Sequence, residues 1–142
     1  MTPVRLLALD YGTARIGVAI SDELGLLAHP RPIVPAEPAE RAFRRIAALV
    51  NEEQIGLVLL GLPQNMDGTE GRSAQRVRKF AALLGARLRC PIEFVDERRS
   101  TVLASLLLRE TGHSAARQKP LIDSASAAVV LQAYLDQRGR SG

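Results

Sequence analysis

The sequence predicts an α/β fold with a mixed five-stranded sheet and helices packed on its faces. The apolar runs Leu6–Leu9 and Ile55–Leu62 are too short for typical helices and suit strands buried on both faces. Between them, residues 39–53 place apolar side chains at spacings of three and four, which is typical of an amphipathic helix. Strand, helix and strand in this order indicate a right-handed crossover with parallel pairing.

The N-terminal strands are expected to form an antiparallel meander. Residues 11–13 make a turn after the first strand, and Ile16–Ile20 returns beside that strand as a hairpin. Only a short edge strand at residues 32–34 is expected next, because proline cannot donate a ladder hydrogen bond and four prolines crowd this stretch: Pro30, Pro32, Pro35 and Pro38. The meander therefore closes one side of the sheet.

The middle of the chain continues the alternation of helix and strand. Ser73 is a suitable N-cap for a helix over residues 73–84. Residues 92–95 form the last strand, and a short helix is expected after it at residues 101–109.

A final helix completes the fold. Residues 111–120 lack apolar periodicity and carry basic side chains, so a mobile loop is expected there. The helix covers Leu121–Gln137 and turns five residues toward the sheet: Ile122, Ser126, Val129, Val130 and Ala133. We expect one domain over residues 1–138 and a disordered tail at residues 139–142.

Composition limits the class of protein. The longest apolar runs are far too short to span a membrane and nothing resembles a signal peptide, so a soluble cytoplasmic protein is expected. The single cysteine, Cys90, excludes an internal disulfide framework and a cysteine-based zinc site. The net charge is +4, and all basic residues except Lys79 and Lys119 are arginines, which bind phosphate bidentately. A phosphate-rich partner is therefore indicated.

Acidic residues follow the strands at the edge where a functional site is expected. In open α/β sheets, functional groups gather at the carboxyl ends of parallel strands. Asp10 ends the first strand, Asp96 and Glu97 end the last one, and Asp123 lies in the first turn of the final helix. Converging carboxylates repel one another unless divalent cations bind them, and oxygen ligands suit Mg²⁺ or Mn²⁺. The pattern indicates phosphodiester hydrolysis with two metal ions about 4 Å apart.

Each acid also has a structural interpretation. Asp10 could form a turn, and Asp123 could complement a helix dipole. Asp96 and Glu97 could pair with neighbouring arginines on the surface. Strand alternation prevents Asp96 and Glu97 from both facing Asp10, because a regular strand places residue 97 on the face of Val95 and residue 96 on the opposite face. Glu97 has one more methylene group, which helps it to reach a metal ion from the start of a loop.

Four motifs occur in order along nearly the whole length of the chain. They are ALDYGTARIGVAISD at residues 8–22, GLPQNMDGTEGRSA at 61–74, DER at 96–98 and LIDSASAAVVL at 121–131. Together they resemble the YqgF/RuvX family of Holliday junction resolvases and pre-16S ribosomal RNA nucleases, which has an RNase H-like fold. The loop motif is the most specific of the four.

The resemblance implies roles for individual residues. Asp10, Glu97 and Asp123 match the catalytic, metal-binding carboxylates of the family, with Asp96 as the rival to Glu97. The glycines of the loop motif and the helix N-terminus after it could hold a substrate phosphate. We expect nucleic acid to contact five residues near the strand ends and this loop: Arg15, Asn65, Arg72, Arg76 and Arg98.

The leading hypothesis is a nuclease that uses Mg²⁺ or Mn²⁺ to process the 5′ end of pre-16S ribosomal RNA. The alternative is a Holliday junction resolvase in DNA recombination and repair, which would act as a homodimer because it cuts two strands symmetrically. The DYGT turn also resembles the phosphate-binding hairpin of sugar kinases and actin-like ATPases, but those proteins close two lobes over a nucleotide. A non-catalytic nucleic-acid-binding module is the third hypothesis.

Overall fold

The computed structural model describes residues 4–63, 69–96 and 115–141, and within the last range the side chains of residues 124–138. Five strands and three helices lie in this part of the chain: β1 (Arg5–Tyr11), β2 (Arg15–Ser21), β3 (Ala28–Pro35), α1 (Ala39–Glu52), β4 (Ile55–Leu62), α2 (Arg72–Gly85), β5 (Ile92–Asp96) and α4 (Ala115–Ser141). The sheet has the order β3-β2-β1-β4-β5. Strands β1, β2 and β3 pair antiparallel, whereas β4 pairs parallel with both β1 and β5. The predicted mixed five-stranded sheet is confirmed.

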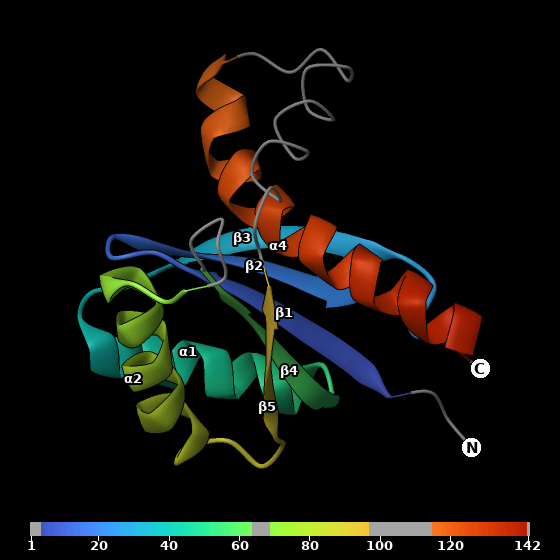
Figure 1. Ribbon diagram of the computed structural model, residues 1–142, viewed down its shortest axis with the longest axis horizontal. Coiled ribbons are helices and arrows are strands. Elements are labelled where there is room, and N and C mark those ends of the chain that lie inside the picture. The colour runs from blue at the N-terminus through green and yellow to red at the C-terminus, as the bar shows by residue number, and fades with distance from the viewer. Residues whose placement is uncertain (1–3, 64–68, 97–114, 142) are drawn as a thin grey trace.

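The sheet separates two apolar cores. Figure 1 shows α1 and α2 on one face and α4 on the other. Because side chains alternate along a strand, β1 contributes to both cores: Leu7 and Leu9 pack on the α1/α2 side, and Leu6 and Ala8 on the α4 side. This alternation fixes the face to which each later residue of β1 belongs.

Strand β3 is longer than the sequence pattern suggests. It has eight residues and contains three of the four prolines of this stretch: Pro30, Pro32 and Pro35. The predicted edge position of this strand is confirmed, but the predicted limit of residues 32–34 is wrong. In an edge strand an N–H group that faces away from β2 needs no partner in the sheet, so prolines can lie along its length. Its pairing with β2 also shifts register between Ile16 and Val18.

Two helix starts differ from the predictions. Helix α2 begins at Arg72 after Gly71, whose extended backbone (φ −103°, ψ −160°) occupies the N-cap position, so Ser73 is not the cap. Helix α4 begins at Ala115, so a loop over residues 115–120 is wrong, while residues 111–114 lie outside the described part of the chain. Residues 115–119 are rich in helix formers, and the first turns of α4 extend beyond the sheet, where no apolar periodicity is needed (Figure 1).

The other end of α4 and its packed side also differ. The helix continues through Ser141, past the expected end at Gln137 and into the expected tail at residues 139–142. Ala133 is exposed, because the buried stripe follows other positions of the helix: Ser124, Ser126, Ala127, Val130, Leu131 and Leu135. The expected helix at residues 101–109 lies outside the described residues. None of the described helices is both long and apolar enough to span a membrane.

Candidate active site

Asp10 lies near the carboxyl end of β1, on the face that α4 covers. Its face follows from the alternation along β1, since Leu6 and Ala8 pack in the core beneath α4. The side chain is partly exposed, and it lines a surface concavity of about 240 Å³ together with residues 11–15. A carboxylate at this position is accessible to solvent and to a ligand.

The neighbours of Asp10 across the sheet are glycines. Gly17 of β2 pairs directly with Asp10. On the other side, Leu9 pairs with Leu60, so the next residue of β4 is Gly61. Both glycines have ordinary strand backbones without a positive φ, so neither is required by backbone conformation. What they provide is the absence of a side chain on both sides of the carboxylate.

The turn after Asp10 is held tightly. The Gly12 N–H group donates a hydrogen bond to the Arg15 carbonyl oxygen at 3.0 Å, and a Cβ at Gly12 would lie only 2.8 Å from that oxygen. The Tyr11 ring stacks on Phe80 of α2, with centroids 4.4 Å apart and an angle of 24° between the rings. The turn is therefore anchored to the helix on the opposite face of the sheet.

Asp96, the last residue of β5, belongs to the face of the sheet opposite to that of Asp10. Phe94 packs on the α1/α2 side and Val95 on the α4 side, so alternation places Asp96 on the α1/α2 face, away from that of Asp10. Glu97 lies outside the described residues. Asp96 and Asp10 thus end two strands of one sheet at the same edge but on different faces.

Asp123 is a residue of α4, and its side chain lies outside the described part of the chain. Its neighbour Ser124 is buried and contacts β2, where the Val18 N–H group donates to the Ser124 Oγ at 3.4 Å. Val18 follows Gly17, the strand partner of Asp10. The fold therefore brings the backbone of α4 at residues 123–124 to the neighbourhood of Asp10, although the two are remote in sequence.

Among the described side chains, no group of three His, Cys, Asp or Glu residues is close enough to hold a metal ion. Two of the three predicted ligands, Glu97 and Asp123, are not among those side chains. Glu70, in the loop motif, accepts two hydrogen bonds of 2.7 Å from Arg78. These hydrogen bonds hold the pKa of Glu70 below its usual range, and they commit this carboxylate to an ion pair.

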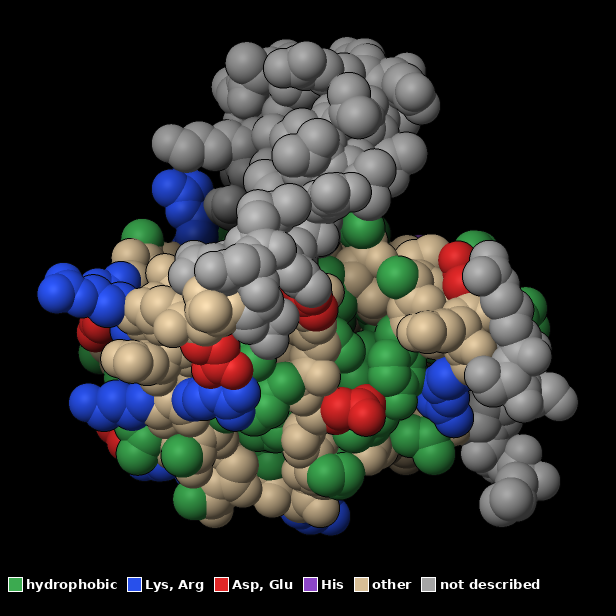
Figure 2. Space-filling view, in the orientation of Figure 1, with side chains coloured by type: hydrophobic (Ala, Val, Ile, Leu, Met, Phe, Trp, Pro, Cys, Tyr) green, Lys and Arg blue, Asp and Glu red, His purple; other side chains and the backbone are tan. Residues whose placement is uncertain are grey.

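The predicted nucleic-acid contacts divide between two places. Arg15 is partly exposed and lines the concavity beside Asp10. Arg72 and Arg76 are exposed in the first turns of α2, and Figure 2 shows Lys and Arg side chains gathered over this helix. Asn65 and Arg98 lie outside the described residues.

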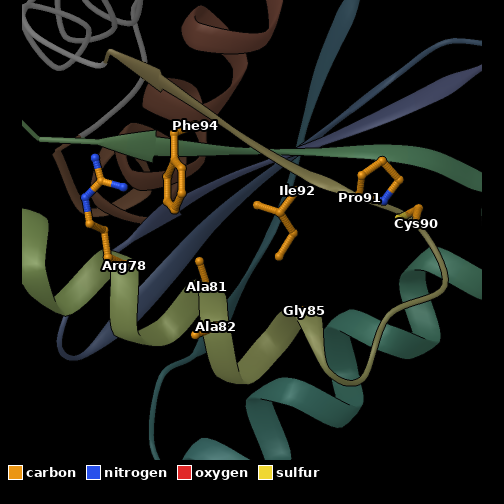
Figure 3. Close-up of a pocket in the computed structure, with 8 residues that line it drawn as sticks. All are labelled: Arg78, Ala81, Ala82, Gly85, Cys90, Pro91, Ile92 and Phe94. Carbon is orange, nitrogen blue, oxygen red and sulfur yellow. The ribbon is translucent and has the colours of Figure 1, made fainter.

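A second concavity, of about 410 Å³, lies between α2 and β5 (Figure 3). Small residues of α2, including Ala81, Ala82 and Gly85, leave the space below the apolar side chains of β5. The Arg78 guanidinium lies over the Phe94 ring, 5.0 Å from its centroid. The lining of this concavity contains no acidic residue, and the concavity lies on the α1/α2 side of the sheet. It is therefore separate from the Asp10 site.

Three residues near Asp10 were not among the predicted site residues: Gly17, Gly61 and Ser124. A single glycine inside an apolar strand pattern is a recognisable signal for close approach of another group, and both glycines show it. Ser124 has no comparable signal, because its partners are backbone groups of strands about a hundred residues earlier in the chain.

Comparison with known proteins identifies relatives over nearly the whole chain. The model of the family described as "RuvX: Holliday junction resolvase" matches residues 4–137. A protein of Chloroflexus aggregans named "Putative pre-16S rRNA nuclease" is 44% identical over 138 residues, which cover 97% of this chain and 97% of that protein. A protein of the same name from an Anaeromyxobacter species is 43% identical over 135 residues, covering 95% and 98%.

Two solved structures have a similar fold at low identity. Thermus thermophilus RuvC in complex with a Holliday junction substrate has a TM-score of 0.57 and 16% identity, covering 96% of this chain and 97% of that one. The fowlpox virus resolvase in complex with Holliday junction DNA has a TM-score of 0.59 and 11% identity, with coverage of 95% and 99%. These likenesses confirm the RNase H-like fold.

Proposed function

Because this chain belongs to the RuvX family, we propose that it is a nuclease that hydrolyses phosphodiester bonds, acting in the cytoplasm on the 5′ end of pre-16S ribosomal RNA. The observation that carries the proposal is the placement of Asp10. It is an accessible carboxylate at the end of a central strand, flanked by two glycines and facing the layer formed by α4. The names of the relatives support RNA as the substrate.

The donor set fits a divalent cation. Asp10 offers carboxylate oxygens that are partly exposed, and its strand neighbours, Gly17 and Gly61, carry no side chains. We propose that Asp10, Glu97 and Asp123 hold Mg²⁺ or Mn²⁺ as a two-metal site, which would stabilise the charge that develops on the phosphate oxygens. Asp96 is not included, because it belongs to the other face of the sheet.

The remaining residues serve substrate binding. Arg15 beside Asp10 and the exposed Arg72 and Arg76 of α2 would neutralise phosphates of the nucleic acid, with Asn65 and Arg98 as further contacts. The glycine neighbours of Asp10 would allow the sugar–phosphate backbone to approach the carboxylate closely. Substrate binding and cleavage would then occur at one edge of the sheet.

The family description favours a second candidate, Holliday junction resolution. A resolvase must cut two strands symmetrically and would act as a homodimer, whereas end processing of RNA requires only one subunit. Oligomeric state and substrate preference therefore separate the two candidates.

A parallel cleavage assay tests the proposal. The substrates are RNA with the 5′ extension of 16S ribosomal RNA, single-stranded DNA and a four-way DNA junction, each with Mg²⁺, Mn²⁺ or chelator, and Asp10→Asn is the control variant. We expect the parent protein, but not Asp10→Asn, to cleave the RNA when Mg²⁺ or Mn²⁺ is present. Cleavage of the junction by a dimer in preference to RNA would favour the resolvase, and binding without cleavage of any substrate would reject a nuclease.

A further inference from the structure

Ser124 occupies a position in α4 where the packing pattern requires an apolar residue. Ser124, Ala127, Leu131 and Leu135 follow one another at spacings of three and four, and all are buried. The last three belong to the apolar core beneath the helix. A hydroxyl in such a stripe is unfavourable unless it is hydrogen-bonded, so the partners of Ser124 are informative.

Those partners belong to two neighbouring strands. The Val18 N–H group of β2 donates to the Ser124 Oγ at 3.4 Å, and the Ser124 hydroxyl donates to the Arg31 carbonyl oxygen of β3 at 2.5 Å. Val18 and Arg31 are paired at the point where the β2–β3 register shifts. One side chain of α4 thus joins both strands at an irregularity of the ladder.

The contact of Ser124 with Val18 lies next to the proposed site, in the strand and in the helix. Val18 follows Gly17, which pairs with Asp10, and residue 123 precedes Ser124 in the helix. Building on the proposed function, we infer that Ser124 is a positioning residue that holds α4 in register beside Asp10. It sets the separation of the carboxylates contributed by the strand and the helix.

A second contact between α4 and the sheet region explains why loss of the Ser124 hydroxyl would affect only part of the helix. Farther along α4, Gln132 accepts a hydrogen bond from the Ala28 N–H group at 2.9 Å and donates one to the Leu26 carbonyl oxygen at 2.9 Å. Loss of the Ser124 hydroxyl leaves these two hydrogen bonds of Gln132 in place. The helix therefore stays attached to the sheet at Gln132, while its part near residue 123 gains freedom.

A matched pair of variants tests the inference. Ser124→Val and Ser124→Thr introduce side chains of the same shape, but only threonine retains the hydroxyl. The control is Ser21→Ala, at the last residue of β2. Ser21 is also buried, and its hydroxyl accepts a hydrogen bond from the Leu6 N–H group at 2.9 Å. Turnover on the RNA substrate, the Mn²⁺ concentration that gives half of the maximal rise in melting temperature, and amide hydrogen exchange are measured for each.

Ser124→Val is expected to lower turnover by about tenfold or more at temperatures where it is fully folded, because small displacements of reacting groups are costly. Its Mn²⁺ midpoint should rise, whereas Ser124→Thr stays close to the parent in both measurements. Ser21→Ala should lose stability but keep its turnover. The inference is wrong if Ser124→Val matches Ser124→Thr in turnover and in Mn²⁺ midpoint.

Hydrogen exchange separates this inference from the proposed function. If the parent cleaves no substrate, the proposed nuclease activity fails, but the positioning role is still decided by exchange in α4. Faster exchange at residues 124–130 than at residues 132–138 in Ser124→Val, and not in Ser21→Ala, supports the role. Unchanged exchange at residues 124–130 overturns it.

Discussion

Asp10 lies directly across the β1–β2 ladder from Gly17, so the carboxylate faces a residue without a side chain. Gly17 is buried and has an ordinary strand backbone. Substitution with Ala would therefore add a methyl group beside Asp10 without backbone strain. We expect Gly17→Ala to reduce cleavage by about tenfold while the protein remains folded, since the methyl group restricts the approach of ligand to the carboxylate. Gly85→Ala, at the end of α2, is the control, because a Cβ there would lie 3.7 Å from the Ile92 Cδ1, an ordinary contact. Equal activity of both variants would contradict the expectation.

Asp10→Asn should abolish cleavage and leave the fold intact. The substitution removes a proposed cation ligand, and it also removes charge from a site where carboxylates would repel one another without metal. The melting temperature measured in chelator should therefore stay the same or rise. Activity equal to that of the parent in Mg²⁺ or Mn²⁺ would exclude Asp10 as a ligand.

The adjacent acids at the end of β5 can be separated by mutation. Glu97→Gln is expected to lower turnover at saturating cation by a factor comparable to Asp10→Asn. Asp96→Asn should have a much smaller effect, because Asp96 belongs to the α1/α2 face. The reverse result in the same assay would reassign the second ligand to Asp96 without excluding a nuclease.

Binding of nucleic acid should weaken steeply with salt. Neutralising Z phosphates of a single strand gives a slope of log affinity against log salt of roughly −0.7Z. Arg72→Ala and Arg76→Ala should each reduce that slope by about 0.7. Arg78→Ala is the control on the same helix and should change it less, because Arg78 is paired with Glu70. Equal effects of all three variants would indicate a general charge effect instead of specific contacts.

The Tyr11–Phe80 stack should couple the turn after Asp10 to α2. In a double-mutant cycle of Tyr11→Leu and Phe80→Leu, the coupling free energy of unfolding should be about 0.5–1.5 kcal/mol, the range of aromatic pairs. Chemical denaturation of the four proteins measures it. A coupling near zero would mean that the turn is held by its backbone alone.

The sequence predicts those parts of the fold that burial dictates. A strand buried on both faces must be apolar throughout, so the run Ile55–Leu62 predicts β4 to its ends. The same reasoning places Asp10 near a strand end, and alternation correctly puts Phe94 and Val95 on opposite faces. The resemblance to the YqgF/RuvX family is confirmed by the family match.

The features that escape prediction depend on tertiary position. The prolines correctly predict that β3 lies at the edge of the sheet, but they do not reveal that its pairing with β2 extends from Ala28 to Pro35. Apolar periodicity reports contact with a core, so it misses the turns of α4 that extend beyond the sheet. The role of Ser124 depends on a register shift between two other strands.

The unequal cores on the two faces have a consequence for how function fails. The described part of the α4-side core consists of leucines and alanines, whereas the opposite core also contains the larger side chains of Phe43 and Phe80. The sheet separates the two cores, so the α4 layer can lose its packing while the α1/α2 core is retained. If the α4 layer separates first under mild denaturant, the protein will become inactive while most of its sheet persists. Inactivation would then precede unfolding, and could be reversed by dilution.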